Sequence, residues 1–211
     1  MAETTSLQLA ADLRVSWQVA TDGLDAAERL LAIEVARLSR RPVDEVRIGR
    51  SCPHCGSSQH GRPVLLGGAG RRPDLSLSLS RAPGMVLVAV SCHHRVGVDI
   101  ERLDAAGTLA STTVVLHPEE HARGAAELTR VWVRKESVLK ATGEGLRVDP
   151  AQVRLSAPDE EPRVLEWPAD HDPGSVWMAD MRIDGYAACV SVLRDGTRLS
   201  SPTGAPGVVP L

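Results

Sequence analysis

Two lysines five residues apart occur in the stretch WVRKESVLKATGEGL of residues 132–146. Lys135 and Lys140 are the only lysines among 24 basic residues, and the other 22 are arginines. An ammonium group is a compact charge on a flexible stem, whereas a guanidinium is a rigid planar fork. The pattern suggests a site that needs the smaller cation. The open alternative is that two lysines fell in one window by chance.

Glu136 directly follows Lys135 and lies four residues from both Trp132 and Lys140. In a helix, residues four apart share one face, so these three side chains form one stripe. We expect the apolar neighbours of this stripe to anchor the helix in a core, namely Trp132, Leu139 and Val131 or Val138. Glu136 and Lys140 would then lie at the boundary of the core. The alternative is an exposed Glu–Lys pair.

A second motif, VGVDIE at residues 96–101, reads as a β-strand with alternating faces. Its valines and isoleucine would point one way, and Asp99 and Glu101 would point the other way with Gly97. At about 3.3 Å per residue, the two carboxylates would lie roughly 7 Å apart. Hard oxygen ligands of this kind suit Mg²⁺. The alternative is a strand whose acidic end runs out into solvent.

The elements that would position these motifs follow from hydrophobic periodicity. Residues 24–40 predict a helix, and residues 118–143 predict helix ending at Gly143 or Gly145. Residues 75–80, 85–91 and 95–101 predict an antiparallel meander, and residues 153–156, 175–183 and 186–193 predict further strands. This order favours an α+β fold, with one main helix and about three strands in each of two similar halves. The Gly, Pro and Ser-rich residues 196–211 predict a disordered tail.

Composition excludes several classes of protein. A length of 211 residues allows one large domain or two small ones, with a core that needs no disulfide. The net charge of −3 gives no electrostatic argument for binding nucleic acid. The sequence has no apolar run of 18 residues and no basic leader segment, so we expect a cytoplasmic protein that does not bind membranes. The four cysteines are too few and too irregular for a disulfide scaffold, and we interpret them as reduced thiols.

The segment CPHCG at residues 52–56 has the Cys-x-x-Cys spacing of a zinc ligand pair. His54, His60 and the distant CHH of residues 92–94 could complete a zinc site, although a second Cys-x-x-Cys is absent. In that case the protein could be a zinc-bearing interaction module. Otherwise the segment is a loop with two thiols.

Taken together, the motifs resemble those of the Sfp-type 4′-phosphopantetheinyl transferases. The resemblance extends over roughly residues 25–193. It rests on five segments in the same order, which are HGRP (60–63), SLS (78–80), VGVDIE (96–101), WVRKESVLKATGEGL (132–146) and GYAACVSV (185–192).

The resemblance implies a cytoplasmic, monomeric enzyme with two similar α/β halves related by a pseudo-twofold axis and an active site between them. Residues 1–101 would form the coenzyme A-binding half, and residues 102–195 would form the C-terminal half. The family transfers the phosphopantetheine arm of coenzyme A to a serine of an apo carrier protein, leaving adenosine 3′,5′-bisphosphate. The carrier would be an acyl or peptidyl carrier protein of polyketide, nonribosomal peptide, siderophore or fatty acid synthesis.

The resemblance also implies residue roles. Asp99, Glu101 and Glu136 match the family's Mg²⁺ ligands, and Glu136 also matches the base that deprotonates the attacking serine. Lys140 matches the lysine that faces the pyrophosphate, and Lys135 matches its neighbour at the site.

Several arginines match positions that contact coenzyme A in the family. Arg29 and Arg37 in the first helix match family arginines, with Arg29 the candidate for the 3′-phosphate, or else part of a solvated helix face. Arg62 of HGRP replaces a lysine near the adenine. Ser80 and Arg81 also match residues that bind coenzyme A. Arg81 replaces the phosphate-contacting histidine of the family, which keeps a cation but changes its reach. A catalytically weak relative that binds coenzyme A or a carrier protein without transfer is therefore the alternative function.

Overall fold

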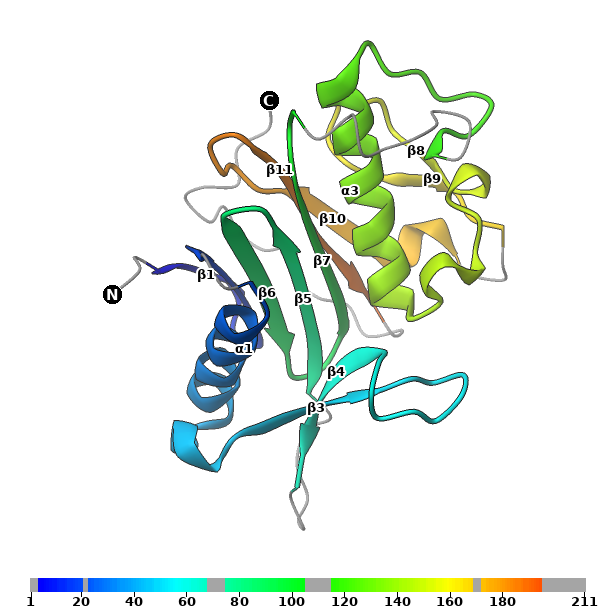
Figure 1. Cartoon of the computed structure of the whole chain (residues 1–211). Helices are drawn as coiled ribbons and strands as arrows, with labels where there is room; N and C mark the ends of the chain where they lie inside the picture. Colours follow the sequence, from blue (N-terminus) through cyan, green and yellow to red (C-terminus); the bar gives the residue numbers. More distant parts are fainter. Residues whose placement is uncertain (1–3, 21–22, 68–74, 105–114, 169–171, 195–211) are drawn as a thin grey trace.

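The computed structural model describes residues 4–20, 23–67, 75–104, 115–168 and 172–194. Within these ranges the chain has a mixed α/β fold, with two α-helices and several antiparallel sheets (Figure 1). The predicted combination of helices with antiparallel strands is therefore confirmed. No helix in the described ranges is both long and apolar enough to cross a membrane. The predicted tail at 196–211 lies outside the described residues.

The first sheet has four strands in the order β1-β2-β6-β5, and each neighbouring pair is antiparallel. Its strands are β1 (Thr4–Ala10), β2 (Leu13–Val19), β5 (Ser76–Ala82) and β6 (Met85–Ser91). Strands β1 and β2 were not predicted. The apolar alternation of Leu13, Val15 and Trp17 was the available signal.

Helix α1 (Gly23–Ser39) covers one face of this sheet (Figure 1). The apolar side of the helix is buried against Val86, Val88 and Val90 of β6 and comprises Ala27, Leu30, Leu31 and Val35. The helix ends where Arg40 adopts a positive φ of 54°, which is incompatible with a further helical turn.

The second sheet has three antiparallel strands in the order β10-β11-β7. Its strands are β7 (Arg95–Arg102), β10 (Val176–Asp180) and β11 (Tyr186–Leu193). Helix α3 (Ala125–Thr142) packs along β7 and β11 (Figure 1). As predicted, the helix stops at Gly143, which has a φ of 78° and donates its N–H to the carbonyl of Leu139 at 3.0 Å.

The predicted start of this helix was wrong. Residues 118–124 are not helical, and α3 begins only after Gly124, which has a φ of 88°. A residue in this conformation cannot continue a right-handed helix, so the helical pattern of PEEHARG does not join α3.

The shorter elements lie around the two sheets. They are η1 (Val43–Glu45), the hairpin of β3 (Arg47–Ser51) and β4 (Arg62–Leu66), η3 (Gly145–Arg147), η4 (Pro150–Gln152), the pair β8 (Arg154–Leu155) and β9 (Val164–Glu166), and η5 (Pro173–Ser175).

The predicted meander was also wrong in its third strand. Strands β5 and β6 form a hairpin, but β7 leaves their sheet and pairs with β11, from Arg95 opposite Leu193 to Arg102 opposite Tyr186. The reason is that eight residue pairs with a distant strand compete with, and replace, pairing to the neighbour in sequence.

Serine side chains join β7 to β5 instead. The hydroxyl oxygens of Ser76 and Ser78 accept hydrogen bonds from the backbone N–H groups of Val96 and Val98, each at 3.0 Å. Where β5 and β7 meet, the alternating serines of LSLSLS therefore accept the hydrogen bonds that backbone carbonyls would accept within a sheet. The next serine in this alternation is Ser80, which reaches Asp99.

Glu34 of α1 forms a buried ion-pair cluster. Its carboxylate, which is 0% exposed, accepts hydrogen bonds from Arg14 Nε at 2.5 Å, Arg37 Nη1 at 2.7 Å and Ser6 Oγ at 3.3 Å. Arg37, a family-matched arginine, therefore has a structural partner here. Burial alone would raise the pKa of Glu34, but hydrogen bonds from Arg14 and Ser16 and the charges of Arg14 and Arg37 lower it on balance.

A lowered pKa in the folded state means that the ionised carboxylate stabilises the fold above its unfolded pKa. That contribution is lost as the pH falls below about 4.5 and through the folded pKa. We expect Glu34→Gln to lower the free energy of unfolding at pH 7 by about 1–3 kcal/mol and to flatten its acid dependence. Urea unfolding at pH 7 and pH 4 measures both effects. Glu28→Gln, in the half-exposed Arg50 pair of the same helix, is the control, and an equal deficit for Glu34→Gln at both pH values would contradict the assignment.

Candidate functional site

Three elements meet at Asp99 of β7. Its Oδ1 accepts hydrogen bonds from Lys140 Nζ of α3 and Ser80 Oγ of β5, each at 2.6 Å. Lys140 Nζ also lies 3.3 Å from Ser80 Oγ and donates to the Val98 carbonyl at 3.2 Å. The structure therefore brings the VGVDIE strand, the Lys140 helix and the serine strand to one point.

The glycine of VGVDIE permits this close approach. A Cβ atom at Gly97 would lie 2.0 Å from the Ser137 carbonyl oxygen and 2.5 Å from the Ala141 nitrogen, both in the backbone of α3. Only a residue without a side chain allows the helix to lie directly on the strand. On the other face of β7, the predicted apolar set is buried in the core between the sheets, as Val96, Val98 and Ile100.

Asp99, Glu101 and Glu136, here called the carboxylate cluster, influence one another electrostatically. Burial is the main cause that raises the pKa of Glu136, the charges of Asp99 and Glu101 raise it further, and Lys140 opposes them. Burial likewise raises the pKa of Glu101, with Asp99 adding to the effect and Lys140 opposing it. As the sequence predicted, Glu136 and Lys140 lie at the boundary of the core, each partly exposed. A bound cation would offset this mutual repulsion.

Two buried carboxylate oxygens, Asp99 Oδ2 and Glu136 Oε1, have no hydrogen-bond partner among the described residues. Unpartnered anionic oxygens of this kind fit a hard divalent cation. The cluster is spread out, however. In the described ranges, the one set of at least three His, Cys, Asp or Glu ligand atoms within 4.8 Å of one another is Cys52, Cys55 and His60.

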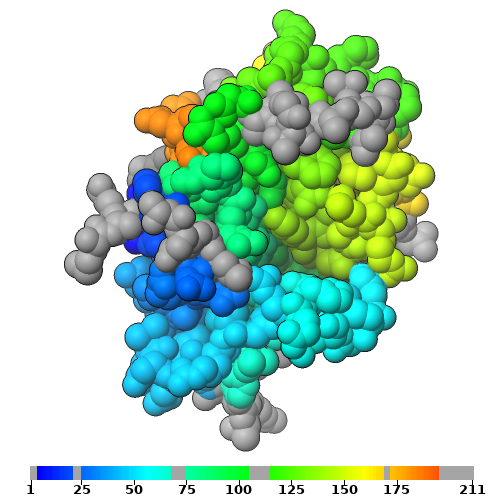
Figure 2. Space-filling model, viewed as in Figure 1, coloured from blue at the N-terminus to red at the C-terminus, as the bar shows by residue number. Residues whose placement is uncertain are grey.

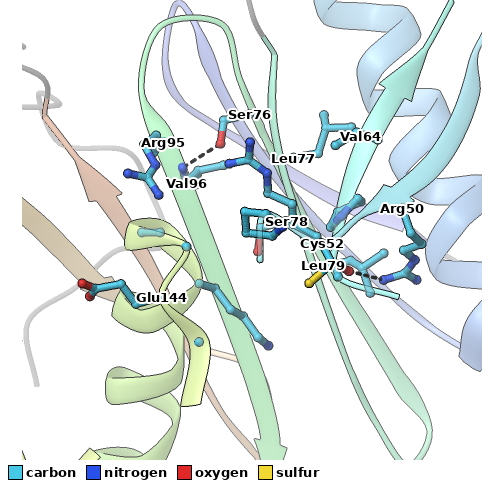
Figure 3. A pocket seen from close by; sticks show the side chains of 18 of the residues that line it. Arg50, Cys52, Val64, Ser76, Leu77, Ser78, Leu79, Arg95, Val96 and Glu144 are labelled. Atoms are coloured by element: carbon cyan, nitrogen blue, oxygen red, sulfur yellow. Dashed lines mark hydrogen bonds between the residues drawn. The ribbon is translucent and has the colours of Figure 1, made fainter. Parts of the chain in front are cut away.

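A pocket of about 1540 Å³ lies beside Lys140. It is bounded by the β3–β4 hairpin, by β5, by the start of β7 and by residues 139–147 at the end of α3. Figure 3 shows Arg50 and Cys52 on one side and Arg95 and Glu144 on the other. On the surface, the cyan β3–β4 hairpin lies next to the yellow-green residues that follow α3 (Figure 2).

The lining of this pocket is strongly cationic. One acidic residue, Glu144, lines it together with the basic side chains Arg50, Arg62, Arg95, Lys140 and Arg147. Such a lining suits a ligand that carries several negative charges. Since Lys140 both lines the pocket and bonds Asp99, it connects the pocket to the carboxylate cluster.

Lys135 is not part of this site. Its side chain is 0% exposed, and Nζ donates to Glu120 Oε2 at 2.5 Å, to the Val115 carbonyl at 2.7 Å and to the Pro150 carbonyl at 2.9 Å. The interpretation of Lys135 as a second cation at the pyrophosphate conflicts with this geometry, because all three donors of its ammonium are used inside the fold.

The other predicted residues are divided between the pocket and the surface. Arg62 lines the pocket, and Ser80 contacts Asp99 rather than the pocket. Arg29 and Arg81 are exposed and do not line it. Sequence reasoning missed three lining arginines, Arg50, Arg95 and Arg147, because they come from separate elements and share no spacing that could have indicated them.

The CPHCG segment forms the loop between β3 and β4. Cys52, Cys55 and His60 lie together, with Cys55 Sγ 3.3 Å from His60 Nε2. The suggestion that Cys92, His93 or His94 completes a zinc site was wrong, since none of them belongs to this group. His54 is turned toward η3, where its Nδ1 lies 2.6 Å from Arg147 Nη1.

Comparison with known families identifies the second half of the chain. Residues 95–191 match a family model, ACPS, described as the 4′-phosphopantetheinyl transferase superfamily. No curated protein matches the sequence. The matched residues run from β7 into β11 and include the carboxylate cluster and Lys140. The chain therefore carries a 4′-phosphopantetheinyl transferase superfamily domain at residues 95–191.

Proposed function

We propose that the protein is a Mg²⁺-dependent phosphopantetheinyl transferase of the holo-[acyl-carrier-protein] synthase type. It moves the 4′-phosphopantetheine arm of coenzyme A to a serine of an apo acyl or peptidyl carrier protein. The observation that carries the proposal is Lys140, whose ammonium joins the carboxylate cluster to a cationic pocket. Phosphopantetheine transfer in general is supported by the superfamily domain.

In the proposed reaction, Glu136 accepts the proton of the carrier serine, whose hydroxyl oxygen attacks the phosphorus that bears the pantetheine arm. The new bond is a serine phosphodiester, and the broken bond is the pyrophosphate P–O bond, so adenosine 3′,5′-bisphosphate leaves. The raised pKa of Glu136, which is caused mainly by burial, brings this carboxylate closer to the range suited to a general base. Lys140 stabilises the negative charge that develops on the leaving oxygen.

The carboxylate cluster would hold the Mg²⁺ ion. Asp99 Oδ2 and Glu136 Oε1 are the donors that lack protein partners, and Glu101 lies near enough for the charge of Asp99 to raise its pKa. When bound, the ion would neutralise part of the negative charge of the pyrophosphate. Lys140, which bonds Asp99 Oδ1 and also lines the pocket, would face the pyrophosphate from the edge of the cluster.

The cationic pocket would bind the nucleotide part of coenzyme A. Arg62 would lie near the adenine, and Arg50, Arg95 and Arg147, which also line the pocket, would lie near the phosphates. Guanidinium groups bind phosphates through paired hydrogen bonds. Arg29 and Arg81 lie outside the pocket lining. Arg29 is proposed to contact the 3′-phosphate, and Arg81 is proposed to contact a phosphate in place of the family histidine.

We further propose that the chain acts as a cytoplasmic monomer of two halves, residues 1–101 and 102–195, related by a pseudo-twofold axis. Each half has one helix on an antiparallel sheet, and β7 lies at their junction. The carrier protein would serve polyketide, nonribosomal peptide, siderophore or fatty acid synthesis, and no nucleic acid or membrane partner is proposed.

Incubation with coenzyme A, Mg²⁺ and several apo carrier proteins tests the proposal, with the carrier mass as the readout. Addition of one phosphopantetheine arm supports transfer. Binding of coenzyme A without any mass change would favour the alternative, a catalytically weak relative. The specific observation behind that alternative is Arg81, which stands where the family has a phosphate-contacting histidine.

Lys140→Arg tests why a lysine persists at this position. Its Nζ lies within 3.3 Å of three oxygens, and a longer planar guanidinium cannot occupy the same point. A displacement of about 1 Å costs on the order of 100-fold in rate, so we expect that loss in turnover with little change in coenzyme A affinity. Arg130→Lys, in the same helix, is the matched control. Turnover of Lys140→Arg close to the wild type would show that charge alone suffices.

A further inference from the structure

The Cys52, Cys55 and His60 side chains are arranged as metal ligands. Their sulfur and nitrogen atoms lie within 4.8 Å of one another. For tetrahedral zinc with Zn–S of about 2.3 Å and Zn–N of about 2.0 Å, the separation between sulfur and nitrogen is about 3.5 Å. The Cys55 Sγ to His60 Nε2 distance of 3.3 Å is close to that value.

The backbone of the loop supports this arrangement. Cys52 N donates to the Ser57 carbonyl at 2.9 Å, and Gly56 N donates to the Cys52 carbonyl at 3.0 Å, so the two cysteines lie on one tight turn. Both cysteines are free of disulfides.

Gly61 brings the histidine back to this turn. Its φ is 100°, and a Cβ atom there would lie 2.4 Å from the Ser51 carbonyl oxygen. The chain after His60 therefore passes directly against the backbone that leads into Cys52. A side chain at position 61 would push His60 away from the cysteines.

We propose that Cys52, Cys55 and His60 bind one zinc ion, with water as the fourth ligand. Water is assigned because His54, the other histidine of this loop, lies outside the cluster and has its Nδ1 bonded to Arg147. Two thiolates and a neutral imidazole select zinc over Mg²⁺ or Ca²⁺. Binding releases the two thiol protons to solvent, and the resulting centre is neutral, so it adds no charge to a pocket that is already cationic.

This zinc site would fix one wall of the pocket. Cys52, Pro53, His54, Gly61 and Arg62 all line the pocket, and they belong to the loop that the ion would close. The ligands Cys55 and His60 are exposed, so neither anchors the loop by packing in a core. The metal would hold Arg62 and the His54 contact to Arg147 in place, whether or not the protein catalyses transfer.

The test measures metal content and loop protection rather than activity. The full-length protein is loaded with zinc, dialysed and analysed by inductively coupled plasma mass spectrometry. We expect about one zinc ion per chain in the wild type and a loss of at least about tenfold in Cys55→Ser and in His60→Ala. Cys92→Ser and His93→Ala are the matched controls, since these residues lie outside the cluster, and both should keep the zinc.

Hydrogen–deuterium exchange of the wild type before and after chelation provides a second readout. It uses no variant, so misfolding of a substituted protein cannot explain its result. We expect faster exchange in residues 52–62 after chelation and no change in α1. The proposal is overturned if the wild type holds no more zinc than Cys55→Ser, if the controls lose zinc equally, or if thiol titration shows a Cys52–Cys55 disulfide in the zinc-loaded protein.

Discussion

Glu136→Gln is expected to lower the rate of carrier modification by a factor on the order of 10²–10⁴, the range that a positioned general base contributes. The amide has nearly the same shape as the carboxylate but cannot accept the serine proton, and it brings no charge to the cation. The fold should be unaffected, because Glu136 Oε1 has no hydrogen-bond partner among the described residues. Initial rates at saturating coenzyme A and Mg²⁺, read from the carrier mass, measure the effect.

Glu127→Gln is the matched control, since Glu127 lies in the first turn of the same helix, away from the carboxylate cluster. Its rate should stay close to the wild type. If Glu136→Gln changes only the apparent affinity for coenzyme A and leaves the saturated rate intact, Glu136 is not the base.

Lys135→Met is expected to lower the free energy of unfolding by about 3–5 kcal/mol, the cost of breaking a buried ion pair from one side. Its partner Glu120 is 7% exposed and would remain charged in the interior. Glu120 also accepts hydrogen bonds from the backbone of His117 and Leu155, so it joins the segment before α3 to β8. Without Lys135, that network loses its cation.

Urea unfolding of Lys135→Met and Lys140→Met separates the two lysines. The Lys140 side chain is 30% exposed, so its loss should cost less stability and far more turnover. The double variant Lys135→Met/Glu120→Gln should recover part of the lost stability, because it removes the unpaired charge. A stable Lys135→Met protein that has lost turnover would instead restore Lys135 to the proposed site.

The local elements of the site followed from the sequence. The apolar spacing of α1, the glycine at the end of α3 and the alternation of β7 are properties of neighbouring residues, and each predicts the observed element. The joint pattern of VGVDIE and the Lys140 helix also identified the superfamily that residues 95–191 match. These features depend on residue type and on spacing along the chain, which a sequence states directly, because helices and strands have fixed periodicities.

The strand partners were decided only by the tertiary structure. The sequence predicted that β7 would follow β6 in a meander, whereas β7 pairs with β11, almost a hundred residues further along the chain, and contacts β5 through serine hydroxyls. Periodicity indicates that a strand has two faces and contains no information about which distant strand completes its hydrogen bonds.

The same limit applies to the two lysines. Five residues correspond to about 1.4 helical turns, so Lys135 and Lys140 must point roughly 140° apart, and both cannot face one site. Which one faces it depends on how α3 lies against β7, and Gly97 sets that contact by letting the helix backbone approach the strand. The sequence determined that the two lysines face different sides of the helix. The packing of α3 against β7 decided that Lys140 meets Asp99, while Lys135 is buried with Glu120.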